Sequence, residues 1–135
     1  PEELMQRGGA YYSDSAAELM ADIHTDAGTT HIVNTLNNGA VPGFPDDAVM
    51  EIPAVISAKG ASSIKTTTMR GDIDGLVRSV KDFELLTIQA AVHGDEESAL
   101  RALITNPIGP DIALARELWA DLRKENAGMI GLFNE

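Results

Sequence analysis

The order of apolar and polar residues predicts a helix and then a strand at the start of the chain. Between Ser13 and His24 the apolar residues recur at helical spacing, and Ser13 is a residue type that caps helices. Asp14 lies early in this segment, where the helix dipole favours negative charge. Residues 29–34 alternate and are rich in β-branched side chains, which predicts a short strand. Gly28 is expected to separate the two elements.

Two further strands are expected before the chain becomes helical. Residues 49–57 are mostly apolar and predict the second strand, and Pro53 places that strand at an edge or a bulge of the sheet. Lys59 and Gly60 offer a turn. The β-branched residues of segment 64–68 then predict a third strand.

The second half of the chain predicts three helices. Apolar residues follow a helical stripe from Ile73 until Gly94, a residue type that ends helices. Asp95 is expected to cap a second helix, which continues to Thr105. Asp111 is expected to begin the third.

Composition limits the function classes that remain. With 135 residues, 44% of them hydrophobic, the chain can bury its own core, so residues 1–135 are expected to form a single α+β domain. Its 10 basic and 21 acidic residues give a formal net charge of −11. Because so acidic a surface repels phosphate backbones and anionic headgroups, nucleic acid and membranes are not expected as partners.

The chain contains no cysteine. This excludes disulfide scaffolds, thiolate zinc sites and cysteine nucleophiles, and it is typical of a cytoplasmic protein. The N-terminus is charged and lacks the apolar segment of a signal peptide. Because the sequence opens at Pro1 without an initiator Met, we expect it to be a fragment of a longer protein.

Few side chains outside the solvated helix faces are candidates for chemistry. Glu84 lies on an apolar stripe, where a carboxylate needs a partner, and a structural acid satisfied by a backbone or Arg donor is the favoured interpretation. The histidines His24, His31 and His93 have no metal-site spacing, so a self-contained metal site is not expected. No Gly-rich loop of the nucleotide-binding kind is present.

The most unusual stretch is RGGAYYSD at residues 7–14. Its two glycines allow the backbone to approach another surface closely, and Arg7 offers a fork of donors for an anion. Tyr11 and Tyr12 stand directly before a predicted helix N-terminus, which favours a phenolate. Composition alone favours a structural role instead, with the tyrosines packed beneath the loop.

Three runs of sequence carry a resemblance to a known family. They are RGGAYYSDSAAELM, then HIVNTLNNGAVPGFPDDAVMEIPAVI, and then KDFELLTIQAAVHGDEESALRALITNPIGPD. Together they span nearly the whole chain, and the combination of the RGGAYYS and NNG motifs with the PDD and EIP elements is specific. The chain resembles the C-terminal domain of family four glycoside hydrolases, and within that family its 6-phospho-β-glucosidase branch.

The resemblance implies a fold and a set of cofactors. The fold is the α+β substrate domain of the lactate and malate dehydrogenase C-terminal type, with helices packed on a small, mainly antiparallel sheet. NAD and a divalent metal, usually Mn²⁺, are bound mainly by an N-terminal Rossmann half that is absent here. The substrate is a phosphorylated sugar, and the domain is expected to carry contacts of a homo-oligomer.

The resemblance also implies a reaction and its residues. The family oxidises C3 of the sugar with NAD, which acidifies the proton at C2; elimination, water addition and reduction follow. Tyr12 matches the tyrosine base of the family, with Tyr11 as second choice. Asn37 and Asn38 match a turn near the sugar, although a structural turn is almost as well supported. Arg7 is expected to reach a phosphate or to anchor the loop.

Two alternatives stay open at this point. The chain could be a non-catalytic assembly or regulatory module that has kept the fold. A substrate domain of a 2-hydroxy-acid dehydrogenase is weaker, because that class needs an Asp-paired histidine and no such setting is evident around the three histidines. Whether the chain is the C-terminal domain of a family four glycosidase or a non-catalytic module, we expect the 135 residues alone to be inactive as a glycosidase.

Overall fold

The computed structural model describes residues 11–133. The chain divides between Thr68 and Met69 into two compact units, and each is treated by itself below. Among the described residues, no helix is both long and apolar enough to cross a membrane. The expectation of one domain over residues 1–135 stays a prediction.

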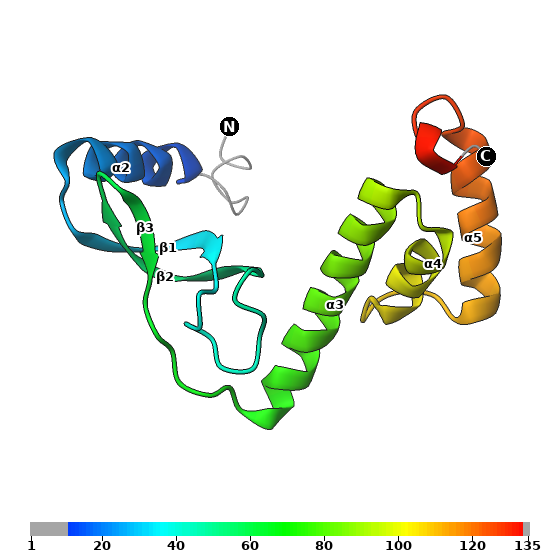
Figure 1. Cartoon of the computed structure of the whole chain (residues 1–135), viewed down its shortest axis with the longest axis horizontal. Helices are drawn as coiled ribbons and strands as arrows, with labels where there is room; N and C mark the ends of the chain where they lie inside the picture. Colours follow the sequence, from blue (N-terminus) through cyan, green and yellow to red (C-terminus); the bar gives the residue numbers. More distant parts are fainter. Residues whose placement is uncertain (1–10, 134–135) are drawn as a thin grey trace, which may run out of the picture. The chain divides into compact units, whose positions relative to one another are not determined.

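Within residues 11–68, the first unit contains one helix and a three-stranded sheet (Figure 1). Helix α2 spans Tyr12–Thr25. The strands β1 (Thr29–Leu36), β2 (Val49–Ser57) and β3 (Gly60–Ser63) are antiparallel and lie in the order β1-β2-β3. The predicted helix and the first two strands are therefore confirmed.

The core of this unit lies on one face of the sheet. Met50, Ile52, Ala54 and Ile56 alternate along β2 and are all buried. Alternate residues of a strand point to the same face, so these four side chains form one apolar surface. His31 of β1 is opposite Ala54 and shares that face. Helix α2 packs against β2 there.

The prediction that Pro53 marks an edge or a bulge is wrong, because β2 is the central strand. The carbonyl of Pro53 accepts a hydrogen bond from the Ile64 amide, with an N···O distance of 2.9 Å. In a strand, the N–H and C=O of one residue point to the same side. The missing N–H of Pro53 therefore faces the position just beyond Ser63, where β3 ends.

The prediction of a strand at residues 64–68 is also wrong. Pairing with β2 begins directly after the Ala58–Lys59 turn, with Gly60 opposite Ser57. Gly60 has φ +99°, a backbone conformation that favours glycine, so the turn closes at this residue. β3 is therefore finished before Ile64, and the chain then leaves the sheet.

Helix α2 begins slightly earlier than its sequence suggests. The amide of Ser15 donates to the carbonyl of Tyr11, at 3.0 Å, and this bond closes the first turn. Tyr11 is therefore the N-cap residue and makes no side-chain capping bond, while Ser13 lies inside the helix. The expectation that Ser13 caps α2 is wrong by two positions.

The second unit is helical, and its three long helices confirm the predicted pattern (Figure 1). Helix α3 spans Gly71–His93, α4 spans Glu96–Thr105 and α5 spans Ile112–Glu125; a short 3-10 helix, η1, spans Gly131–Phe133. The buried apolar residues of this unit are small: Ala90, Ala99, Ala102 and Ala115. Small side chains allow the helices to approach one another closely.

The predicted helix ends are confirmed by their backbone geometry. Gly94 has φ +68° and its amide donates to Ala90, which ends α3. The Asp95 carboxylate accepts a hydrogen bond from the Glu97 amide, and the Asp111 carboxylate accepts one from Leu114. The α+β class with a small antiparallel sheet is confirmed.

Candidate functional site

The two tyrosines lie at the start of α2 and point to solvent. The side chain of Tyr11 is 71% exposed and that of Tyr12 is 77% exposed, so neither is packed beneath a loop. Tyr12 is the first residue of the helix. The unpaired backbone N–H groups of a first helical turn, together with the helix dipole, favour negative charge there. Arg7, the expected anion-binding residue, lies outside the described residues.

Asn37 is the organising residue of the loop between β1 and β2. It is fully buried. Its Nδ2 donates to the carbonyls of Val41, Phe44 and Pro45 at 3.2, 3.0 and 3.1 Å, and its Oδ1 accepts from the Val41 amide at 2.7 Å. The side chain therefore acts on the loop itself. Its expected contact with a sugar stays a prediction.

Asn38 differs from its neighbour, because it is exposed. Its φ of +46° is unusual for a residue with a side chain, and asparagine is one of the types that tolerate it. The amide of Asn38 donates to the carbonyl of Asp46 at 2.9 Å, which joins the turn to the PDD segment. Asn38 is therefore the exposed asparagine of the pair.

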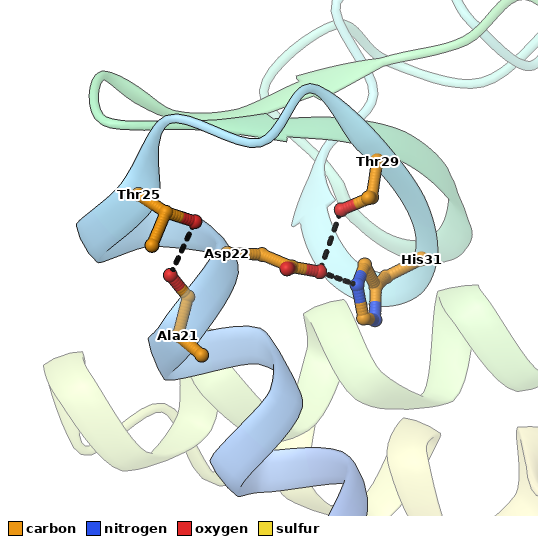
Figure 2. A network of polar contacts seen from close by, with 5 residues as sticks. All are labelled: Ala21, Asp22, Thr25, Thr29 and His31. Atoms are coloured by element: carbon orange, nitrogen blue, oxygen red, sulfur yellow. Dashed lines mark hydrogen bonds and ion pairs between the residues drawn. The ribbon is translucent and has the colours of Figure 1, made fainter.

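A polar network joins α2 to β1, and sequence reasoning missed it (Figure 2). One carboxylate oxygen of Asp22, Oδ2, accepts from the hydroxyl of Thr29 at 2.6 Å and lies 2.6 Å from Nε2 of His31. A carboxylate can only accept, so Nε2 carries the hydrogen. The hydroxyl of Thr29, and then the ring of His31, hold the pKa of Asp22 below its ordinary value.

The expectation that none of the histidines has an aspartate partner is wrong, because His31 pairs with Asp22. Asp22 and His31 are nine positions apart, on different elements. The αL residue Asp26 and the glycine Gly28 reverse the chain between them. That helix–glycine–strand pattern is the signal in the sequence that brings the two side chains together.

The remaining candidates are Glu84 and two histidines. Glu84 pairs with Lys81, so the donor is a lysine and not the expected backbone or Arg group, and the Glu84 side chain is 45% exposed rather than buried. His24 and His93 are exposed in the last turns of their helices. Within residues 11–133, no group of three or more His, Cys, Asp or Glu side chains could hold a metal ion.

Comparison with known proteins decides the family. The model of the family 4 glycosyl hydrolase C-terminal domain matches residues 1–109, which include both tyrosines and both asparagines. The chain belongs to this family. The match crosses the boundary between the two compact units, so both contain sequence typical of the family 4 domain.

Individual relatives agree with this assignment. The family 4 domain is 40% identical to the 6-phospho-beta-glucosidase BglT of Thermotoga maritima over 98% of this chain, and 33% identical to the 6-phospho-beta-glucosidase of Escherichia coli over 88% of it. These matches cover 32% and 29% of the two relatives, so the chain spans about a third of their length.

Solved structures match the fold. A structure of the Thermotoga maritima 6-phospho-beta glucosidase with manganese, NAD⁺ and glucose-6-phosphate superposes with a TM-score of 0.84 at 38% identity, covering 96% of this chain and 32% of that one. A 6-phospho-alpha-glucosidase from gut microorganisms, with NAD and glucose-6-phosphate, gives a TM-score of 0.83 at 25% identity over 90% of this chain and 27% of that one.

Proposed function

We propose that this family 4 domain is the C-terminal part of a glycosidase that hydrolyses 6-phospho-β-glucosides, and that Tyr12 is its base. The observation that supports the proposal most directly is the position of Tyr12 within the family match. It is an exposed phenol at the first residue of a helix, in a chain whose high-coverage relatives are 6-phospho-β-glucosidases.

Within residues 11–133, no group of three or more His, Cys, Asp or Glu side chains could hold a metal ion, and the sequence has neither cysteine nor a Gly-rich nucleotide loop. We therefore assign NAD and Mn²⁺ to other parts of the full-length enzyme. There NAD would oxidise C3 of the sugar, and this oxidation makes the proton at C2 acidic.

The role of Tyr12 follows from that acidity. As a phenolate it accepts the C2 proton, the electron pair of the C2–H bond forms the double bond between C1 and C2, and the bond from C1 to the glycosidic oxygen breaks while that oxygen takes a proton from water. The resulting hydroxide adds at C1, the phenol returns its proton to C2, and NADH would return the hydride to C3.

We assign substrate binding to Arg7, which precedes this helix in the sequence, and to Asn38, which follows β1. Arg7 would hold the sugar phosphate through its fork of N–H donors. Asn38 faces outward from the β1–β2 loop and would contact a sugar hydroxyl, while Asn37 keeps that loop in shape. The acidic composition of the chain, with a net charge of −11, makes a local basic residue necessary for an anionic substrate.

The test is Tyr12→Phe in the full-length enzyme, assayed with a 6-phospho-β-glucoside. Phenylalanine keeps the ring and removes the ionisable oxygen, so we expect kcat to fall by about 10²–10⁴-fold, the usual contribution of a general base. In deuterated water the wild type should exchange the C2 hydrogen and the variant should not. Tyr11→Phe is the matched control and should stay within about threefold of wild type.

The activities of the two tyrosine variants show which residue, if either, is the base. If Tyr12→Phe retains normal turnover and exchange, Tyr12 is not the base. If Tyr11→Phe is the inactive variant, the role belongs to the neighbouring ring. A full-length enzyme that binds 6-phospho-β-glucosides without cleaving them would instead support a non-catalytic module.

A further inference from the structure

The helix that begins with Tyr12 packs on the sheet and is also joined to it by side-chain hydrogen bonds near its other end. No residue of α2 is fully buried, so the helix contributes little to the apolar core. Its side-chain hydrogen bonds to the sheet come from Asp22, and the Ala58 amide donates to Oδ1 of the C-cap residue Asp26 at 2.8 Å. These directed bonds contribute to the orientation of α2.

The bond between Asp22 and His31 is the most sheltered of these. Its side chain is 22% exposed and that of His31 is 21% exposed, and the Oδ2···Nε2 distance of 2.6 Å is short for a bond of this kind. Thr29 donates to the same oxygen, so two residues of β1 fix one atom of α2 (Figure 2). His31 in turn lies opposite Ala54 at the buried centre of the sheet.

We propose that Asp22 and His31 are positioning residues of the reaction, which set the orientation of α2 and thereby place the phenol of Tyr12 against the substrate. This inference rests on the proposed function, because it requires Tyr12 to be the base. Neither residue touches the substrate: at 1.5 Å per residue, Asp22 lies about 15 Å along the helix from Tyr12. They act through the helix between them.

A small tilt of α2 around Asp22 is enough to change the rate of the reaction. A tilt of about 5° around Asp22 moves the start of α2 by about 1.3 Å, given a lever of about 15 Å. A displacement of about 1 Å in a reacting group can cost about 10²-fold in rate. Loss of the Asp22–His31 bond is therefore expected to lower the rate of proton transfer without removing any group that binds the sugar.

The experiment compares His31→Ala with His31→Gln in the full-length enzyme. Alanine removes the donor, and we expect kcat to fall about 10- to 100-fold while KM changes less than about threefold. Glutamine places an N–H at a similar reach, so His31→Gln should recover most of the activity. The substrate carrying deuterium at C2 should show a larger isotope effect on kcat with His31→Ala than with wild type, because proton removal has become slower.

Matched variants on the same helix provide the controls. Glu18→Gln removes one negative charge from the exposed part of α2, and His24→Ala removes an exposed histidine from it; both should stay within about twofold of wild type. Asp22→Ala should resemble His31→Ala, and the double variant should be little worse than either, because the two side chains act as one unit. Far-UV circular dichroism checks that each variant is folded.

The outcomes are distinct from those of the proposed function. If Tyr12→Phe is inactive but His31→Ala and Asp22→Ala have normal kcat, the positioning role is wrong and the base stands. If His31→Ala loses activity with an unchanged isotope effect, or if His31→Gln is as poor as alanine, the positioning role is also wrong. If Asp22→Ala does not fold, the comparison of the two His31 variants and the smaller change Thr29→Val decide. Normal turnover by Tyr12→Phe overturns both.

Discussion

At the level of single residues, Asn37 shows how one polar side chain can define a loop. Three carbonyls and one amide of the β1–β2 loop are bonded to its amide group, and its own backbone carbonyl accepts from the Ala40 amide and the Ser63 hydroxyl. Buried polar groups are costly unless they are bonded, so the loop and the side chain depend on each other.

Replacing Asn37 should destabilise the first unit. Asn37→Ala leaves buried carbonyls without donors, and we expect a loss of about 2 kcal/mol or more. Amides of β2 should then exchange with deuterated solvent about 30-fold faster, which NMR can follow. Asn38→Gly is the control, because glycine readily adopts φ +46° and the residue is exposed. Equal protection in Asn37→Ala and wild type would contradict this account.

The sequence already identified the residue types of the site but not their partners. The Asn-Asn-Gly run predicts a turn from local chemistry alone, and the turn is present. It does not reveal that Asn37 is buried and Asn38 exposed, because that difference depends on loop residues up to eight positions away. The Asp22–His31 pair was missed for the same reason: its bond joins two different elements.

At the level of elements, local signals predicted three helix boundaries of the second unit but misplaced the start of α2 by two residues. The caps at Gly94, Asp95 and Asp111 were predicted, since each bonds within its own helix or turn. The error at Pro53 had another origin. A central strand tolerates proline where the neighbouring strand has already ended on the side that the proline nitrogen faces, and no pattern within β2 contains that information.

The N-terminus of α4 should respond to pH through Asp95. The hydroxyl of Ser98 bonds its carboxylate at 2.6 Å and, as the largest cause, lowers the pKa of Asp95. Because the folded pKa is below the unfolded one, the stabilisation is complete above about pH 4 and is lost as pH falls through the folded value. An asparagine at position 95 would also cap the helix, but its side chain has no proton to gain or lose in this pH range.

We therefore expect the melting temperatures of wild type and Asp95→Asn, measured by circular dichroism, to differ most near pH 7. The gap should narrow as the pH falls below about 4, where the carboxylate becomes protonated. Ser98→Ala should reduce the pH dependence, since it removes the principal donor. A gap of constant size from pH 7 to pH 2.5 would show that Asp95 contributes no pH-dependent stability.

At the level of the whole molecule, the motifs predicted the family, but the division into two units was not foreseen. The first 68 residues contain every strand of the described chain, and the residues from Met69 onward form only helices. No composition change marks the boundary, because residues 64–70 contain no linker-like run of Gly, Pro or Ser. The boundary is defined by the contacts within each folded unit, which the sequence pattern does not reveal.

The 135-residue chain by itself should have no glycosidase activity, even with NAD and Mn²⁺ added. The chain spans about a third of its relatives, and its described residues offer no metal site. Incubation of the purified chain with a 6-phospho-β-glucoside and both cofactors should give no sugar release above the rate without protein. The full-length enzyme is the positive control. Turnover by the chain alone would mean that the cofactors bind within it.

The distribution of aromatic side chains gives the two units separate optical labels. The only tryptophan of the sequence, Trp119, lies on α5 and packs edge-on against the ring of Phe133, with centroids 5.1 Å apart. Both tyrosines of the sequence stand at the start of α2. Indole fluorescence therefore reports on the helical unit alone, whereas the tyrosines are 71% and 77% exposed in the folded chain and label the start of α2 rather than the packing of the sheet. An unfolding experiment can thus time the helical unit by itself without any added dye.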